Sequence, residues 1–301
     1  MKERVGRGLR IVGATTLLTL NSLAHIGPLL LIALVKALVR VKPVRQVCDR
    51  WLMAIVASWI DVNSWMMDHL TSIRIEVSGL PDDLGNGNYL MLCNHQSWVD
   101  IPVLQKVFNR RIPMLRFFLK SQLFWVPILG LAWWALDFPF MKRYSREQIQ
   151  RRPELAGRDI EATRKACEKY RGIPVVIGNF AEGTRMTAAK HAGQNSPYRH
   201  LLKPRAGGIA FVIDAMGNLL DRILDVTIVY PQGGGELPDL FADRIPEARV
   251  DVRTLPVPAR FQGRNYQTDQ AFRDEFRSWL NELWTEKDQR IEQLLLARLE
   301  K

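Results

Sequence analysis

Cysteine is scarce in this sequence of 301 residues, which contains three, Cys48, Cys93 and Cys167. They lie far apart and form no CxxC pair, which argues against a disulfide framework and against the common cysteine-based metal sites. The spacing predicts reduced, mostly buried thiols in a protein that faces the cytosol.

Acidic residues are outnumbered by basic ones, 31 to 42, which gives a net charge of +11 and an isoelectric point of about 9.8. Such an excess predicts an anionic partner: nucleic acid, a phospholipid surface or a phosphorylated substrate. Nine tryptophans and several apolar runs favour the phospholipid membrane over nucleic acid. The sequence also lacks internal repeats and low-complexity segments, and 47% of its residues are hydrophobic, which is ample for a core.

No charged side chain occurs from Ile11 to Val35 if His25 is neutral. These 25 residues exceed the roughly 20 that a helix needs to cross a hydrocarbon core. Gly27-Pro28 interrupts the run, so the sequence predicts either a kinked span or a re-entrant hairpin. Basic residues flank both sides and no small-residue cleavage site stands out, so we interpret the segment as an uncleaved membrane anchor.

A second helical segment, from Val47 to Leu70, is typical of an interfacial helix beside the first and equally of an ordinary core helix. We expect a helical membrane anchor over residues 1–71 and a globular domain over 72–301. Strand-like runs alternate with helical ones in the second part, which indicates an α/β layered domain. The expected strands are 73–77, 89–93, 114–119, 138–143, 174–180, 223–230 and 249–253, and the expected helices are 101–108, 160–170, 206–216 and 267–296.

A polar turn between a buried strand and a helix carries His95 and Asp100. On a continuous helix these residues would point about 140° apart, but across a strand-to-helix turn they can meet. A carboxylate that holds one imidazole nitrogen leaves the other free as a general base. Taken alone, such a pair near a turn is more often structural than catalytic.

Glu182-Gly183-Thr184-Arg185 directly follows another buried strand. Glycine permits close backbone approach and Arg185 offers a bidentate partner for phosphate; the alternative is a plain β-turn with a solvated salt bridge. Arg143, at the end of a further expected strand, adds a second cation. Since ligands of open α/β sheets usually bind at strand ends, these three ends predict one crevice.

Four sequence blocks resemble those of the glycerolipid acyltransferases, the PlsC-like family that contains 1-acylglycerol-3-phosphate acyltransferase. NHQSWVD (94–100) resembles the NHxxxxD first block, FMKR (140–143) the second, FAEGTR (180–185) the FPEGTR third, and VTIVYP (226–231) the fourth. The second block usually opens with Gly where this chain has Asp137, and the third has Ala181 in place of Pro. The N-terminal anchor and the runs PFMKRYSR and WLNELWTEKD further resemble the YihG-type branch, close to lysocardiolipin acyltransferase-like proteins.

The resemblance implies a mixed sheet covered by helices, a glycerol-phosphate acyltransferase-like fold. It implies transfer of an acyl group from acyl-CoA or acyl-carrier protein to the hydroxyl of a lysophospholipid such as 1-acylglycerol 3-phosphate, without a metal or other cofactor. His95 would deprotonate that hydroxyl and Asp100 would orient His95. The residues that would hold the glycerol phosphate are Arg143, Glu182, Gly183, Thr184 and Arg185, and Pro231 would shape the acyl site. The enzyme would sit at the inner (plasma) membrane with its site facing the cytoplasm.

Two other functions compete with acyl transfer. One is a membrane-associated lipid hydrolase with Ser97 or Ser196 as nucleophile, although neither serine lies in a G-x-S-x-G elbow. The other is a non-enzymatic basic protein that binds a membrane surface or nucleic acid. It would need basic and aromatic residues interleaved on one surface, whereas the aromatic residues here occur mainly in apolar runs.

Overall fold

The structure, a computed structural model, describes residues 2–141, 151–152, 170, 173–264, 266 and 268–297. Arg143 lies outside the described residues, as does the expected helix 160–170 apart from Tyr170. The elements in chain order are α1 Lys2–Leu38, α2 Lys42–Leu70, β1 Arg74–Ser78, β2 Tyr89–Cys93, α3 Asp100–Phe108, β3 Leu115–Phe117, β4 Leu119–Lys120, η1 Ser121–Trp125, α4 Leu129–Ala135, β5 Phe140–Met141, β6 Val176–Phe180, α7 Ala188–Gln194, α8 Ala206–Met216, β7 Arg222–Val229, α9 Leu237–Phe241, β8 Glu247–Leu255, η3 Ala259–Phe261 and α10 Gln270–Leu296.

A six-stranded mixed sheet forms the centre of the fold, in the order β1-β8-β7-β2-β6-β3. Strands β7, β2, β6 and β3 are parallel, whereas β8 is antiparallel to β7 and parallel to β1. Every residue of β2 is buried; Leu90 and Leu92 face one core cluster, and Met91 and Cys93 face the other. Coverage on both faces explains why this strand is a continuous apolar run. The predicted α/β fold with a mixed sheet is confirmed.

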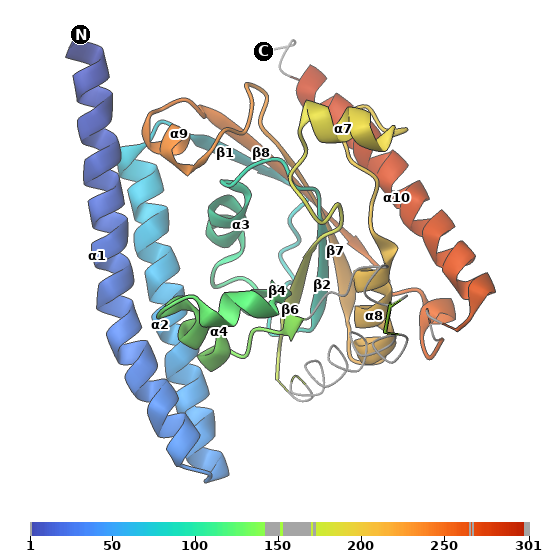
Figure 1. Cartoon of the computed structure of the whole chain (residues 1–301), viewed down its shortest axis with the longest axis horizontal. Helices are drawn as coiled ribbons and strands as arrows, with labels where there is room; N and C mark the ends of the chain where they lie inside the picture. Colours follow the sequence, from blue (N-terminus) through green and yellow to red (C-terminus); the bar gives the residue numbers. More distant parts are fainter. Residues whose placement is uncertain are drawn as a thin grey trace.

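Helices cover both faces of this sheet (Figure 1). On one face, Phe276 and Trp284 of α10 and Ile213 of α8 are in the first core cluster. On the other face, Leu104 and Phe108 of α3 are in the second cluster. The short strands β4 and β5 pair with each other, so the described part of the expected strand 138–143 lies outside the central sheet.

Helices α1 and α2 lie side by side as an antiparallel pair along one flank of the molecule (Figure 1). Pro28 lies inside α1, and the chain reverses only after Leu38, so the re-entrant hairpin expected as one alternative is not formed. A proline removes one N–H donor, while the packing against α2 is retained. Over Gly8–Leu38 this helix is long and apolar enough to cross a membrane, and it is mostly exposed.

Asp137 stands where the second family block usually has glycine, and its backbone conformation suits that exchange. Its φ of 57° is in the left-handed region that glycine adopts without penalty and that aspartate tolerates better than most residues. Its carboxylate lies 2.8 Å from Nζ of Lys36 in α1, and Lys36 also pairs with Asp49 of α2 at 2.7 Å. The aspartate that replaces the usual glycine therefore links the two N-terminal helices to the segment before β5.

A buried ion pair joins α10 to the sheet and can be tested by mutation. Lys287 is fully buried, its Nζ lies 2.6 Å from Oδ1 of Asp225, and it donates to the carbonyl of Val226 at 2.7 Å. Lys287→Met would leave Asp225 with only Arg253 as a counter-charge among the described residues. Because a buried charge that loses its partner is costly, we expect the free energy of unfolding to fall by about 3 kcal/mol. Urea denaturation followed by circular dichroism measures this change.

The control for this variant is Glu286→Gln, at a neighbouring α10 side chain that is 59% exposed and pairs with Arg253 at the surface. We expect it to change stability by less than about 1 kcal/mol. Equal stabilities of the two variants would contradict a structural role for the buried pair.

Candidate active site

His95 and Asp100 meet across the turn between β2 and α3, as their spacing allows. Nδ1 of His95 lies 2.7 Å from Oδ2 of Asp100, with the carboxylate fully buried and the imidazole 18% exposed. Asn94 fixes the start of this turn, since its side chain exchanges two hydrogen bonds of 2.8 Å with the backbone of Ile228 in β7. The pair is therefore built at the carboxyl end of the central strand.

The Asp100 carboxylate accepts four hydrogen bonds. Besides His95, Oδ2 accepts from the backbone N–H groups of Gln96 (2.8 Å) and Ser97 (3.0 Å), and Oδ1 accepts from the hydroxyl of Tyr230 (2.8 Å). A carboxylate is only an acceptor, so Nδ1 of a neutral His95 carries the proton, and Nε2 has the free lone pair. The arrangement presents the nitrogen that a general base needs.

Tyr230 contacts the site, although the sequence motifs did not single it out. Burial, followed by the nearby charge of Asp100, raises the pKa of Tyr230 well above its usual value, so its hydroxyl remains a donor. A buried tyrosine hydroxyl needs a polar partner, and Tyr230 directly precedes Pro231 of the fourth block. Its position beside Pro231 is the sequence feature that could have identified Tyr230 as part of the site. Pro231 is half-buried and lies at the same end of the sheet, just after β7.

Glu182 contacts the turn that carries His95 and Asp100 and is fully buried. Its Oε1 accepts from the backbone N–H of His95 and its Oε2 from that of Leu202, both at 3.0 Å. Burial raises the pKa of Glu182 to about 7, although the two backbone N–H groups favour the charged form. Glu182 is one of the residues expected to hold the glycerol phosphate. In the structure its two oxygens accept from backbone N–H groups, one of them that of His95.

Cationic side chains surround the turn that follows Glu182. Gly183 has a φ of 68°, and a Cβ there would lie 3.0 Å from the Arg205 side chain, so both conformation and space favour glycine. The Arg185 guanidinium lies 4.0 Å from the ring centroid of Trp98. Lys190 donates to the hydroxyl of Thr184 at 2.7 Å. Lys190 and Arg205 join this cluster from later segments, which the four-residue motif alone did not reveal.

Aromatic rings support the imidazole from one side. The His95 ring stacks on Phe180 with centroids 4.0 Å apart, and Phe117 stacks on Phe180 at 5.3 Å. A Cβ on Gly178 would lie 2.4 Å from the Phe117 ring, so the glycine makes room for this stack. The rings limit the orientations open to the imidazole and form an apolar wall beside it.

Both candidate serine nucleophiles have occupied hydroxyls. Ser97 donates to the carbonyls of Gly234 and Gly235 and accepts from the backbone N–H of Val99. Ser196 donates to the carbonyl of Leu201 at 2.6 Å. Ser97 thus connects the turn that carries His95 and Asp100 to the loop after β7. Within the described part of the chain, no group of three or more His, Cys, Asp or Glu residues could hold a metal ion.

The geometry agrees with a family assignment. The family model described as Acyltransferase matches residues 66–231, just over half of the chain, and the chain belongs to this acyltransferase family.

Its relatives include lysocardiolipin acyltransferase 1 of Gallus gallus, 24% identical over 80% of this chain and 63% of the relative. Another is the 1-acyl-sn-glycerol-3-phosphate acyltransferase epsilon of Mus musculus, 27% identical over 55% of this chain and 46% of the relative. The chain thus spans less than two thirds of the length of these relatives. The fold is similar to that of the 1-acyl-sn-glycerophosphate (LPA) acyltransferase PlsC from Thermotoga maritima, with a TM-score of 0.55, 15% identity, and coverage of 95% of this chain and 98% of that one.

Tyr230→Phe tests whether the Tyr230 hydroxyl positions Asp100 and, through it, His95. A hydrogen bond to a charged group contributes about 1.5–3 kcal/mol, so we expect kcat for acyl transfer to fall roughly tenfold or more with KM unchanged. The matched control is Tyr198→Phe, whose hydroxyl donates to Asn281 at 3.2 Å. Equal kcat values in the two variants would contradict the positioning role.

Glu182→Gln tests the buried carboxyl through the pH dependence of stability. Glu182 has a pKa of about 7 in the folded protein and an ordinary value of 4.5. Between these values the folded protein holds a proton that the unfolded chain has released, so the contribution of Glu182 to stability decreases as pH rises through this range and is constant above it. We expect the unfolding free energy of wild type minus that of the variant to fall by up to about 3 kcal/mol from pH 5 to pH 8. Urea denaturation measures it, and a constant difference would contradict the raised pKa.

Proposed function

We propose that the chain is a membrane-bound acyltransferase that moves a fatty acyl group from a thioester donor, acyl-CoA or acyl-carrier protein, to the free hydroxyl of a lysophospholipid. The observation that carries this proposal is the His95–Asp100 pair, whose free Nε2 lies at the same end of the sheet as the cations after β6. The names of the relatives support a lysophospholipid as acceptor.

In the proposed reaction, Nε2 of His95 takes the proton of the acceptor hydroxyl as its oxygen attacks the thioester carbonyl carbon. The new C–O bond forms and the C–S bond breaks, and the imidazolium returns the proton to the departing thiolate. Asp100 holds the imidazole and stabilises its charged form. A thioester is already activated, so a positioned base and two positioned substrates suffice without a covalent enzyme intermediate.

The acceptor phosphate would bind beside the turn at Gly183, where Arg185, Lys190 and Arg205 gather. Arginine suits this role because its planar guanidinium binds phosphate oxygens in pairs. Arg185 also lies 3.8 Å from Glu236, a weak contact that a phosphate would replace. Arg143 remains an expected further phosphate ligand, and Pro231 an expected part of the acyl site.

Membrane attachment is supported by exposed apolar side chains. Leu31 of α1 is 65% exposed and Trp125 of η1 is 81% exposed, and α4 contacts both of these segments. Ion pairs hold α1 to the rest of the chain at both ends, through Arg10 with Asp243 and Lys36 with Asp137. These ion pairs tie α1 to the rest of the chain near both of its ends, which favours an anchor within one leaflet over a helix that crosses the bilayer. We place the enzyme at the inner (plasma) membrane with its site facing the cytoplasm.

The function is tested by incubating the purified full chain with labelled acyl-CoA or acyl-carrier protein and a panel of lysophospholipids in mixed micelles. We expect label to appear in a diacyl product. His95→Ala should lower kcat/KM by about 10²–10⁴-fold, because it removes the general base. Ser97→Ala should only weaken transfer, since it loosens the loop after β7.

The same assay separates transfer from hydrolysis. Release of free fatty acid without a diacyl product, together with an equal loss in Ser97→Ala and His95→Ala, would establish the serine hydrolase instead. Circular dichroism of both variants verifies that neither loss comes from unfolding.

A further inference from the structure

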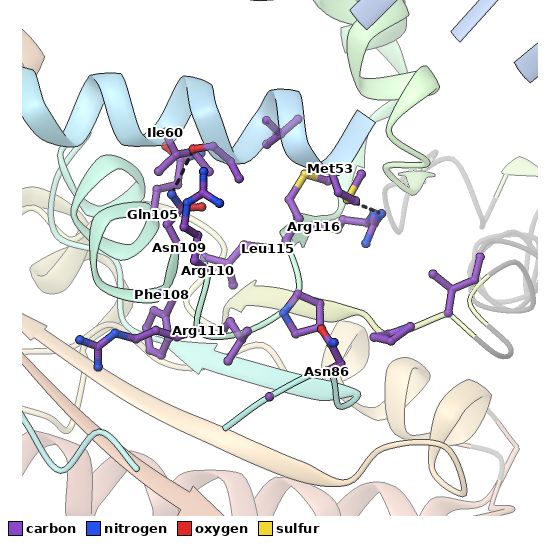
Figure 2. A pocket seen from close by; sticks show the side chains of 18 of the residues that line it. Met53, Ile60, Asn86, Gln105, Phe108, Asn109, Arg110, Arg111, Leu115 and Arg116 are labelled. Atoms are coloured by element: carbon purple, nitrogen blue, oxygen red, sulfur yellow. Dashed lines mark hydrogen bonds between the residues drawn. The ribbon is translucent and has the colours of Figure 1, made fainter. Parts of the chain in front are cut away.

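Figure 2 shows a pocket of about 870 Å³. It lies at the end of the sheet opposite to His95. Its walls include Asn86, just before β2, and Phe108, at the end of α3, whereas His95 follows the other end of β2. The length of β2 alone separates the two ends by about 16 Å. No residue of 94–100 or 180–186 lines the pocket. We call it the α2–α3 pocket, and its volume is within the usual range for a small-molecule site.

Arg116 is the unusual member of this pocket. It is only 5% exposed; its Nε donates to the carbonyl of Leu136 at 2.9 Å, and its Nη2 lies 3.8 Å from the sulfur of Met53 (Figure 2). Its Nη1 has no hydrogen-bond partner among the residues that the structure describes. A guanidinium cannot lose its proton under ordinary conditions, and a buried donor without an acceptor is costly and rare. The geometry therefore calls for an acceptor atom from outside the described chain.

The charge around Arg116 specifies what kind of acceptor fits. Asp49 and Asp137 also line the pocket, and both pair with Lys36. The charged residues that line the pocket are four arginines and three aspartates, a small positive excess: Arg50, Arg110, Arg111, Arg116, Asp49, Asp82 and Asp137. The ligand therefore needs an oxygen that accepts one charged hydrogen bond, and it does not need several negative charges.

The remaining walls are mostly apolar. Leu52, Met53, Val56 and Ile60 enter from one face of α2, and Figure 2 shows α2 running along the pocket. Helix α2 also packs against α1, the helix proposed to lie in the membrane, and Leu52 is in one core cluster with Leu29 and Ala33 of α1. The pocket therefore combines an apolar wall next to the proposed membrane layer with one unsatisfied donor.

We propose that the α2–α3 pocket binds a single-chain acyl lipid, with a head-group oxygen accepting from Nη1 of Arg116 and the chain lying against the apolar face of α2. Free fatty acids and lysophospholipids share this chemistry. This site is separate from the acyl-transfer site and does not depend on catalysis by His95.

The experiment uses the purified full chain in detergent with two photoreactive probes, a fatty acid and a lysophosphatidic acid that carry a diazirine on the chain. After irradiation, peptide mass spectrometry locates the adducts. We expect saturable adducts within residues 49–60 or 105–116 for at least one probe, and the probe that gives them identifies the head group. His95→Ala should leave their yield unchanged.

Arg116→Met removes the donor and keeps the bulk of the side chain. We expect it to weaken probe binding at least tenfold, about 1.4 kcal/mol, which is the low end for a charged hydrogen bond. The matched control is Arg110→Met, at a pocket residue whose guanidinium is 61% exposed and already pairs with Asp61, and we expect it to bind as wild type. If Arg116→Met fails to fold, Ala57→Phe fills the pocket from α2 with Arg116 intact and should abolish the adducts.

Three results would overturn the proposal. One is adducts confined to residues 94–100 or 180–186, or lost in His95→Ala, because the probe would then occupy the catalytic site. Another is wild-type binding by a folded Arg116→Met or Ala57→Phe variant. The third is the absence of saturable adducts with both probes. Each is distinct from failure of acyl transfer, which is read from the diacyl product.

Discussion

The fully buried carboxylate of Asp100 is the group on which the site depends. An ionised carboxylate away from water is stable only when its oxygens are hydrogen-bonded, and here the donors are the imidazole of His95, two backbone N–H groups of the same turn and the hydroxyl of Tyr230. The hydrogen bonds that stabilise the Asp100 carboxylate therefore determine the shape of the turn. The direction of the free nitrogen of His95 follows from that shape, and so from the hydrogen bonds that stabilise the buried carboxylate.

The sheet order brings distant parts of the sequence to this turn. Strand β2 lies between β6 and β7, and Cys93 at its end is in register with Phe180 on one side and Val226 on the other. Glu182 after β6 binds the backbone of His95, and Asn94 binds β7. The first, third and fourth sequence blocks are therefore neighbouring strand ends of one hydrogen-bonded unit. A change in any of these supports acts on His95 without touching a substrate.

The sequence predicted the elements that periodicity or continuous burial defines. The bounds of β2 and α8 match the predicted ranges, because both are apolar runs closed by polar residues or glycine. The meeting of His95 with Asp100 followed from their spacing across a turn. By contrast, a motif lists residues without saying which side chain turns inward, so the burial of Glu182 could not be read from it. Helices α7 and α9 are seven and five residues long, too short for a helical period to show.

The two departures from the family pattern alter residues that support the candidate site and leave the contact between His95 and Asp100 in place. Asp137 keeps the left-handed backbone expected of the usual glycine and adds an ion pair with Lys36. Ala181 replaces a proline, and its backbone N–H, which a proline would lack, donates to the carbonyl of Cys93 at 3.2 Å. That bond continues the pairing of β6 with β2 up to the turn that carries His95. Both substitutions add polar contacts, one between the N-terminal helices and the sheet domain and one between the strands that carry His95 and Glu182. The chemistry proposed for His95 therefore does not require the usual residues at positions 137 and 181.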